Sequence, residues 1–280
     1  MPQPIYEFGG AGRVIHIALA NGFPPETYKP LLDPFTAQYR VVSLPPRALW
    51  PDAGSPQQLR SWRDMAADLL TGMRDYNLSD VIAIGHSMGA VATMLAAIAE
   101  PARFRGIILL DPVFRPSRDL LLLKIFRAIG LQKRLPLVQG ALDRRSHFDN
   151  LDEAFDYWRG KALFKHWPDE LLWHYTKGIT RPAANGGVEL AWSPQWEAQY
   201  YMTVFTESWR EIPKLRDLLP VLMIRGGTST TLQSREFERI RQLLPNATLE
   251  EVPGYGHLFP HDDPETTRRI ISDWLPIIED

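Results

Sequence analysis

The stretch VIAIGHSMGAVATMLAAIAE, residues 81–100, decides the fold. Its first five residues form a short apolar run that is typical of a buried strand, and MGAVATMLAAIAE (88–100) is typical of a helix ended by Pro101. Between them stands G-H-S-M-G (85–89). A serine at so sharp a strand-to-helix turn has its hydroxyl exposed, and glycines two residues to either side let neighbouring backbones approach. We therefore predict a reactive serine at Ser87.

On both sides of this stretch, short apolar runs alternate with longer amphipathic segments. The further runs typical of buried strands are RVIHIALA (13–20), YRVVSLPP (39–46), FRGIILLD (104–111), PVLMIRG (220–226) and ATLEEVP (247–253). Helical spacing of apolar residues predicts helices over 55–77, 231–244 and 263–278, the earliest with Ser55 as N-cap and Pro56 at its first position. Strands alternating with helices indicate an α/β fold, a mostly parallel sheet with helices on both faces.

Residues 115–210 interrupt this alternation. The segment contains no convincing buried strand and suggests several helices joined by turns that carry proline and glycine. Six of the nine tryptophans fall within it: Trp158, Trp167, Trp173, Trp192, Trp196 and Trp209. We therefore expect residues 1–114 and 211–280 to form one core domain, with a helical cap at 115–210 inserted into it.

The composition is that of an ordinary globular protein of 280 residues, with 45% hydrophobic residues and a formal net charge of −2, which favours no nucleic-acid partner. The absence of cysteine excludes disulfides and thiolate nucleophiles. No histidines have metal-ligand spacing, so no metal is expected. The segment MPQPIYEFGG (1–10) is unlike a signal peptide, and no apolar run approaches the ~20 residues of a spanning helix. We expect a soluble, cytoplasmic protein without stable membrane insertion.

A serine nucleophile needs a base, and PGYGHLFPHDDP (253–264) supplies His257 in the loop between the last strand and the last helix. His261, four residues on, is the less favoured candidate. A developing oxyanion needs N–H donors, which we assign to the backbone of Met88, at the helix start, and of Phe23, in the turn NGFPP. The alternative is that the serine is a plain helix N-cap in a nucleotide-binding type of fold.

With these residues in place, the chain resembles the α/β-hydrolase superfamily, in particular its cap-bearing branch with a G-H-S-M-G elbow. The resemblance covers nearly all of residues 13–115 and 215–280. It implies hydrolysis of a carboxylic ester or related acyl bond of a fairly apolar small molecule. The reaction would pass through an acyl-serine intermediate and need no cofactor.

The third member of the predicted Ser–His–acid triad departs from the usual family pattern. The family usually places its acid in a G-x-x-D turn after the strand that follows the cap, but RGGTSTTL (225–232) has Ser229 and Thr230 there. Some relatives take the acid from the end of the preceding strand, and Asp111 ends that strand here. We therefore assign Asp111 as the acid. The alternatives are an ordinary strand-ending aspartate and an incomplete triad, in which one of the two hydroxyls orients the histidine.

A cap over such an elbow has one wall that faces the substrate. Large aromatic residues are usually part of a core, but we expect some of the cap aromatics to line this wall. The candidates are Trp158, Trp192, Trp196 and Tyr200.

The segment DLLLLKIFRAIGLQKRL (119–135) is rich in leucine and carries four basic residues. We expect a cap helix that packs its leucines on the core domain or lines the entrance. The alternative is a helix that lies on an anionic membrane or lipid surface.

The resemblance leaves other functions open. Thioester or carbon–carbon bond hydrolysis is the nearest alternative, whereas Ser87 argues against the epoxide hydrolase and haloalkane dehalogenase chemistries, because those relatives need an aspartate at the elbow. A ligand receptor with weak turnover is a third possibility, and the absence of the usual acid is its only support.

Overall fold

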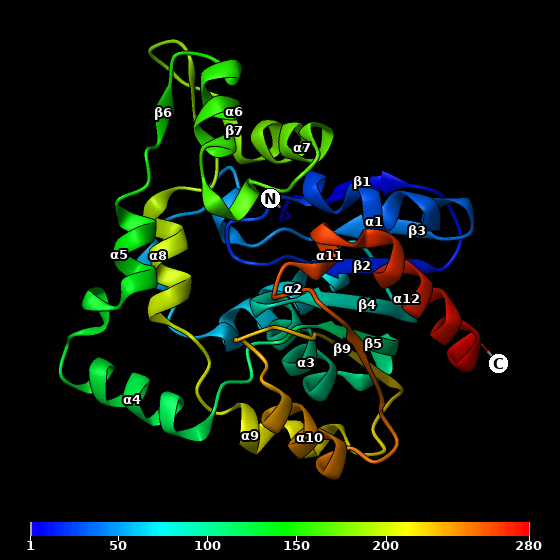
Figure 1. Cartoon of the computed structure of the whole chain (residues 1–280). Helices are drawn as coiled ribbons and strands as arrows, with labels where there is room; N and C mark the ends of the chain where they lie inside the picture. Colours follow the sequence, from blue (N-terminus) through cyan, green and yellow to red (C-terminus); the bar gives the residue numbers. More distant parts are fainter. Residues whose placement is uncertain (1, 280) are drawn as a thin grey trace.

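The protein is built around one seven-stranded sheet, seen in Figure 1 in a computed structural model that describes residues 2–279. The strand order is β1-β3-β2-β4-β5-β9-β10, and all neighbours run parallel except β1 with β3. The strands are β1 (Tyr6–Gly9), β2 (Val14–Ala18), β3 (Arg40–Ser43), β4 (Val81–His86), β5 (Phe104–Leu110), β9 (Val221–Gly226) and β10 (Thr248–Val252). The predicted mostly parallel sheet is confirmed, with one antiparallel strand at its edge.

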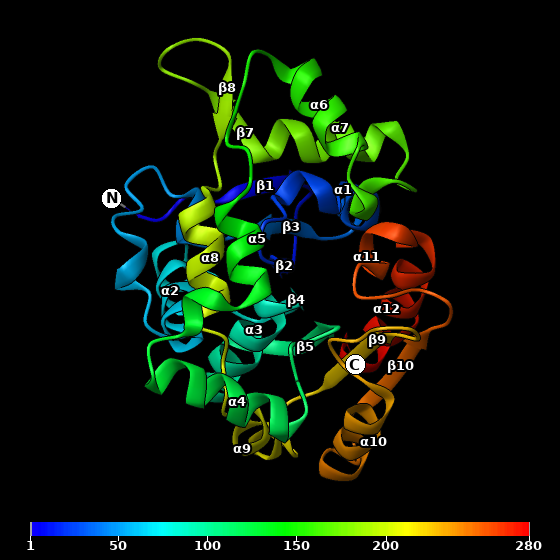
Figure 2. The same ribbon diagram turned by 60° about the vertical axis from the view of Figure 1, so that its left-hand side comes forward.

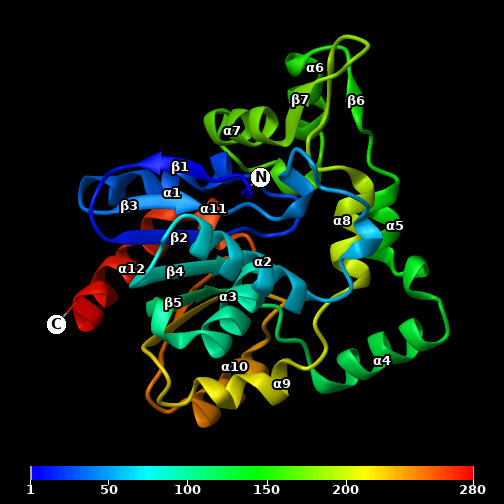
Figure 3. The same ribbon diagram turned by 180° about the vertical axis from the view of Figure 1, so that it is seen from behind.

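Helices cover both faces of this sheet. α2 (Trp62–Asp75) and α3 (Met88–Ala99) lie in front of the sheet in Figure 3, whereas α12 (Pro264–Glu279) lies in front in the opposite view of Figure 1. α12 packs so tightly on β5 that a Cβ at Gly106 would lie 3.0 Å from Trp274. The remaining core helices are α1 (Lys29–Leu32), α10 (Ser234–Leu243) and α11 (Phe259–Asp262). Between residues 2 and 279, no helix has the length and apolar character to cross a membrane.

The central strands are buried on both faces, which explains why they read as continuous apolar runs. Every residue of β4 and of β9 is buried, and so are six of the seven residues of β5. Because parallel strands end at the same edge of a sheet, the residues that follow these strands are brought together there.

The first long helix begins later than the sequence predicts. Ser55 and Pro56 start only a short 3₁₀ turn (Pro56–Gln58), and α2 begins at Trp62. Ser61 is its N-cap: the serine hydroxyl accepts from the backbone of the first turn, and the Asp64 carboxylate accepts from the Ser61 N–H at 3.1 Å. This reciprocal capping box is a stronger helix start than the Ser-Pro pair, which lacks a side-chain capping bond.

The inserted segment lies beside the sheet, and Figure 2 shows its helices arrayed along one side of the core. Its helices are α4 (Ser117–Ala128), α5 (Pro136–Leu142), α6 (Leu151–Arg159), α7 (Asp169–Ile179), α8 (Pro194–Met202) and α9 (Ser208–Glu211). Besides the expected helices, the segment contains a small antiparallel sheet of order β6-β8-β7, which the sequence did not indicate. These strands, β6 (His147–Phe148), β7 (Thr180–Pro182) and β8 (Val188–Leu190), are too short to produce an apolar alternation in the sequence.

Candidate active site

Ser87 stands at the tip of a strained turn between β4 and α3. Its φ of 58° and ψ of −115° lie outside the regions that non-glycine residues normally adopt. The turn depends on close backbone packing, since a Cβ at Gly89 would lie 2.2 Å from the carbonyl oxygen of Ala18 on β2. The Ser87 N–H donates to the carbonyl of Leu110 at 2.9 Å, which ties the turn to β5.

The structure brings the three predicted side chains into a continuous hydrogen-bonded row. Ser87 Oγ lies 2.9 Å from His257 Nε2, and His257 Nδ1 lies 2.7 Å from Asp111 Oδ2. The carboxylate only accepts, so Nδ1 carries the proton and Nε2 is free to accept the serine proton. These contacts join residues 170 and 146 positions apart in the sequence.

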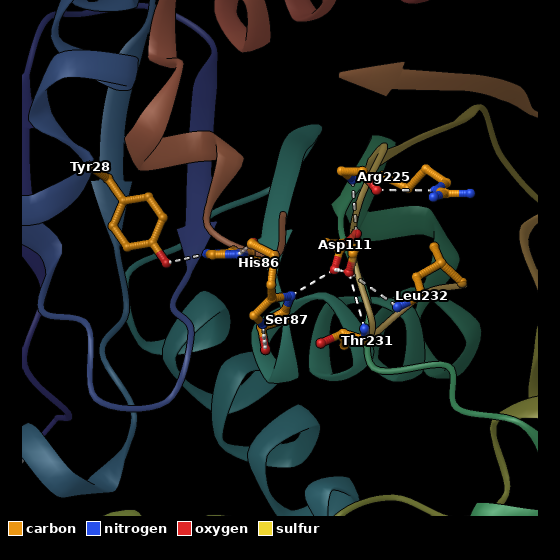
Figure 4. A network of polar contacts seen from close by, with 10 residues as sticks. Tyr28, His86, Ser87, Asp111, Arg225, Thr231 and Leu232 are labelled. Atoms are coloured by element: carbon orange, nitrogen blue, oxygen red, sulfur yellow. Dashed lines mark hydrogen bonds and ion pairs between the residues drawn. The ribbon is translucent and has the colours of Figure 1, made fainter. Parts of the chain in front are cut away.

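Asp111 is held firmly at the end of β5, where it is fully buried with a φ of 40°. The backbone N–H of Gly226 donates to Oδ1 at 3.0 Å, and the hydroxyl of Ser229 donates to Oδ2 at 2.5 Å. Ser229 Oγ in turn accepts from the N–H of Thr231 at 3.1 Å. Figure 4 shows this network around the carboxylate. The last residue of β9 and the loop after it therefore each supply a donor to the acid, and the loop carries no acid of its own.

A second polar chain links the elbow to the loop after β2, and the sequence analysis missed it. Tyr28 accepts from the N–H of Ala20 at 3.0 Å and lies 2.8 Å from His86 Nδ1, to which it donates (Figure 4). His86 Nε2 lies 3.0 Å from the carbonyl oxygen of His257, to which it donates. Burial, aided by the nearby His257 and His261, holds the pKa of His86 well below its usual 6.5, so the ring is neutral. Its only sequence signal is its place inside the G-H-S-M-G motif.

His261 belongs to the packing behind the site. It is 3% exposed, and its ring lies between those of Tyr28 and Trp167, with centroid separations of 4.6 Å and 5.3 Å. Its Nε2 lies 3.3 Å from the hydroxyl of Thr27. Burial lowers the pKa of His261 to about 3. His257 therefore lies beside Ser87, whereas the polar contact of His261 is with Thr27.

The two backbone donors assigned to the oxyanion differ in their surroundings. Met88 is the first residue of α3, so its N–H has no acceptor within the helix. The N–H of Phe23 already donates to the carbonyl of Ala20 at 3.2 Å, a long hydrogen bond within the turn. The Phe23 ring lies against His261 on one side of the turn, with 5.0 Å between centroids.

The turn that carries Phe23 is also held by the inserted segment. Asn21 Nδ2 donates to the backbone carbonyl of Glu197 at 3.0 Å, and the Glu197 carboxylate forms a buried ion pair with Arg144. A Cβ at Gly22 would lie 3.3 Å from the Arg144 guanidinium, so the ion pair packs directly on the turn. Arg144 also donates to the hydroxyl of Tyr175 at 2.7 Å.

A cavity of about 660 Å³ opens onto Ser87, Met88 and His257. Its lining is mostly apolar, and α4, α5 and the segment between them contribute the apolar side chains of Leu122, Leu123, Phe126, Leu135, Leu137 and Val138. The aromatic residues that line it are Phe23, Trp62, Phe126 and Tyr201.

The prediction for the substrate wall needs correction. None of the four predicted aromatic residues lines this cavity: Trp158, Trp192, Trp196 and Tyr200. All four are at most 5% exposed and pack in the core. The Arg144 guanidinium lies 4.8 Å from the centre of the Trp158 ring, and the Trp192 and Tyr200 rings meet edge to face. Their residue type indicated burial, but which side of each cap helix faces the cavity depends on tertiary packing.

A twisted parallel sheet with a serine on a strained strand-to-helix turn, and a histidine and an aspartate at the same edge, is the architecture of the α/β hydrolases. Residues 16–270 match the model of the Alpha/beta hydrolase family. Because this match covers most of the chain, the chain belongs to that family.

Individual relatives are distant. The chain is 24% identical to monoglyceride lipase of Rattus norvegicus over 75% of its own length and 62% of the relative's. It is 22% identical to 2-(acetamidomethylene)succinate hydrolase of Mesorhizobium japonicum, over 76% of this chain and 70% of that protein. Across the lipase and two comparably similar curated relatives, the match spans 62% to 66% of the relative's length.

Solved structures agree on the fold. A crystal structure of E-2-(acetamidomethylene)succinate hydrolase superimposes with a TM-score of 0.73 at 20% identity, covering 97% of this chain and 94% of that one. A marine microorganism esterase gives a TM-score of 0.72 at 16% identity, covering 97% and 98%. At these identities the likeness establishes the fold alone.

Proposed function

We propose that this protein is a serine hydrolase that cleaves a carboxylic ester of a fairly apolar small molecule through an acyl-serine intermediate. The observation that carries the proposal is the hydrogen-bonded row from Ser87 through His257 to the buried Asp111. This row has the donor and acceptor directions that nucleophilic serine catalysis requires.

In the proposed reaction, His257 Nε2 takes the proton of Ser87 as the serine oxygen attacks the ester carbonyl carbon. Asp111 stabilises the imidazolium that results, and the Met88 N–H donates to the oxyanion. The tetrahedral intermediate expels the alkoxide, which takes the proton from His257 and leaves as an alcohol. A water then loses its proton to the same nitrogen and attacks the acyl-serine, releasing the carboxylic acid and restoring the serine.

The second oxyanion donor in this proposal is the N–H of Phe23. Its bond to the carbonyl of Ala20 is long at 3.2 Å, so a substrate oxyanion can share the same hydrogen in a three-centre arrangement. The Tyr28–His86 chain supports this role, because its hydrogen bonds to Ala20 and to the His257 carbonyl fix the turn relative to the loop that carries His257.

The substrate class follows from the cavity. Its volume of about 660 Å³ and its leucine-rich lining suit a medium or long acyl chain, and the only side chains of opposite charge in the lining, Arg115 and Asp119, pair with each other at 3.2 Å. The cavity therefore favours a neutral, apolar substrate over a charged one.

The receptor alternative loses its support in this proposal. It depended on the lack of an acid in the loop after β9, and the 2.7 Å contact between Asp111 and His257 supplies an acid from β5. Thioesters remain in the proposed range, because an acyl-serine forms from either type of acyl donor.

The test is steady-state hydrolysis of p-nitrophenyl esters from acetate to laurate, with acyl thioesters in parallel. We expect kcat/KM to rise with chain length and then fall once the chain exceeds the cavity. Ser87→Ala, with its fold checked by circular dichroism, should lose activity by several orders of magnitude, since loss of such a nucleophile costs about 10⁶ in a known case. Ser87→Ala activity within tenfold of wild type would refute the proposed mechanism.

A further inference from the structure

Helix α4 is apolar on two sides, and only one of them faces the protein. Leu123 and Phe126 line the cavity and Leu120 is 4% exposed, as expected for a packed cap helix. The leucines of this helix were expected to pack on the core domain or to line the entrance, and the opposite side of the helix does neither. Three large residues of this outer side face solvent with high exposed fractions: Leu121 at 59%, Ile125 at 45% and Ile129, just after the helix, at 59%.

Two further exposed leucines join this outer side to the catalytic cavity. Leu122 on α4 is 55% exposed and Leu137 on α5 is 62% exposed, yet both also line the cavity. The five residues Leu121, Leu122, Ile125, Ile129 and Leu137 form what we call the α4 surface. They are half of the large hydrophobic residues that are strongly exposed among residues 2–279, gathered within seventeen positions. Figures 1 and 3 show α4 at the outer edge of the inserted segment.

The α4 surface is framed by positive charge. Lys124, Lys133 and Arg134 are exposed, and none of the three forms an ion pair with the residues that the structure describes. The acidic residue of the helix, Asp119, is already engaged by Arg115 at 3.2 Å and by Arg118 at 3.5 Å. The surface therefore presents exposed apolar side chains and uncompensated cations together.

We infer that the α4 surface adsorbs to a lipid–water interface that carries anionic headgroups, and so opens the cavity toward lipid. Leucine and isoleucine side chains gain by leaving water for the acyl boundary, and lysine and arginine are attracted to the headgroups. Because Leu122 and Leu137 belong to both the surface and the cavity, an apolar ester passes from lipid to Ser87 without crossing bulk water. Such adsorption is peripheral and involves no spanning segment.

The inference states that the protein binds a lipid surface. It also deepens the proposed function by naming esters held in lipid as the substrates, and this second part rests on the proposed function. The competing occupant of the α4 surface is a second copy of this chain. Charge favours lipid, because self-association across this surface would bring like charges together at Lys124, Lys133 and Arg134.

The direct test is co-flotation of the full-length protein with vesicles of phosphatidylcholine mixed with phosphatidylserine, and with vesicles of phosphatidylcholine alone. We expect clear binding to the mixed vesicles, weakened by salt. The triple variant Leu121→Gln, Ile125→Gln, Ile129→Gln should lower the partition coefficient more than tenfold. Glutamine keeps the helix propensity of α4, and none of the three side chains lines the cavity.

A second variant measures the contribution of the positive charges to vesicle binding, and a third variant serves as a control for the loss of exposed apolar side chains. Lys124→Gln, Lys133→Gln, Arg134→Gln should weaken binding to the mixed vesicles by about fivefold for each charge, and should change binding to phosphatidylcholine little. The matched control is Leu163→Gln with Ile277→Gln, which removes leucine and isoleucine side chains that are 55% and 65% exposed elsewhere. This control should bind as the wild type does.

Activity then distinguishes the two proposals. The Leu121, Ile125 and Ile129 variant should hydrolyse a soluble short-chain ester at the wild-type rate and an ester embedded in vesicles more slowly. Wild-type protein that floats with vesicles but cleaves neither ester would refute the proposed function and leave the adsorption standing. Wild-type protein that ignores anionic vesicles, or that sediments as a dimer which the triple variant dissociates, would overturn the inference.

Discussion

Ser229 donates a hydrogen bond from its hydroxyl to the carboxylate of Asp111, with 2.5 Å between Oγ and Oδ2. In the family pattern the acid stands near Ser229, after the strand that follows the cap. Here that position holds a donor to an acid on the preceding strand. The loop that lacks the acid thus still contributes to the acid's environment.

Asp111→Asn tests the assignment of the acid. Asparagine adopts a positive φ readily, so it fits the backbone at this position, where φ is 40°. It should favour the wrong tautomer of His257 and fail to stabilise the imidazolium, lowering kcat by about 10⁴. The measurement is kcat on a p-nitrophenyl ester, with urea unfolding to confirm that the fold persists. A loss of less than about tenfold would contradict Asp111 as the acid.

Ser229→Ala should be much milder. It removes one of three donors to the carboxylate, while the Gly226 N–H at 3.0 Å and the His257 Nδ1–H at 2.7 Å remain. Loss of one hydrogen bond to a carboxylate corresponds to a decrease in kcat of about ten- to a hundredfold, well below the loss expected for Asp111→Asn. If Ser229→Ala were as damaging as Asp111→Asn, the hydroxyl would have a more direct role than the one assigned here.

The two histidines of the last loop should separate cleanly. His257→Ala removes the base and should abolish turnover about as completely as loss of the serine. His261→Phe keeps an aromatic ring between Tyr28 and Trp167 and gives up one long hydrogen bond to Thr27. We expect it to retain turnover within about tenfold and to shift the unfolding free energy by about 1 kcal/mol. Reversed effects on kcat would show that the wrong histidine was assigned.

The Arg144–Glu197 ion pair should couple the inserted segment to the turn at Gly22. Arg144→Met leaves a buried carboxylate unpaired and should destabilise the protein by about 3–5 kcal/mol. Adding Glu197→Gln removes that charge and should restore part of the loss. Urea unfolding of the single and double variants gives the comparison. Equal stability of the two variants would mean that the unpaired charge is not the cause.

Buried histidines should make the protein less stable in acid. Burial lowers the pKa of His16 to about 3, below the usual 6.5 of an unfolded chain. The unfolded state therefore binds the additional proton, so stability is full above pH 6.5 and falls as the pH drops toward 3. Each such histidine contributes about 1.4 kcal/mol per pH unit within that window.

His16→Gln isolates the contribution of His16 to the pH dependence of stability. Glutamine offers an acceptor for the N–H of Leu44, which now donates to His16 Nε2 at 3.1 Å, and it does not titrate. Unfolding free energies measured between pH 7 and pH 5 should fall less steeply for the variant than for the wild type. Parallel curves would show that His16 binds a proton as readily in the folded protein as in the unfolded chain.

The sheet and the turn that carries Ser87 were predictable because their signals are local. The continuous apolar runs of β4, β5 and β9 are typical of strands buried on both faces of a sheet. The glycines around Ser87 indicate a turn in which neighbouring backbone segments pack too closely for a side chain. His257 was assigned from its place between the last strand and the last helix, whereas Asp111 was assigned from the resemblance to relatives that take the acid from the end of the strand before the cap.

The remaining features depend on contacts between distant segments. Tyr28 and His86 are 58 residues apart, and no sequence pattern predicts the hydrogen bond between them. The cavity wall is likewise a matter of which helix side faces inward: Tyr200 is in the core, whereas Tyr201, the next residue, lines the cavity. The leucines of α4 were expected to pack on the core domain or to line the entrance, and Leu122 and Leu123 do line the cavity. The exposure of the outer side was not predicted, because leucines in a sequence do not reveal whether a partner surface exists.

The most direct test of the central claim is covalent labelling by a fluorophosphonate, with the modified residue located by peptide mass spectrometry. The reagent mimics an acyl donor and reacts only with a serine that a neighbouring base activates. The account predicts one adduct per chain, on Ser87, together with loss of esterase activity, and no adduct on the Ser87→Ala or His257→Ala variants. An unlabelled wild-type protein, or an adduct on another residue that accompanies the loss of activity, would contradict it.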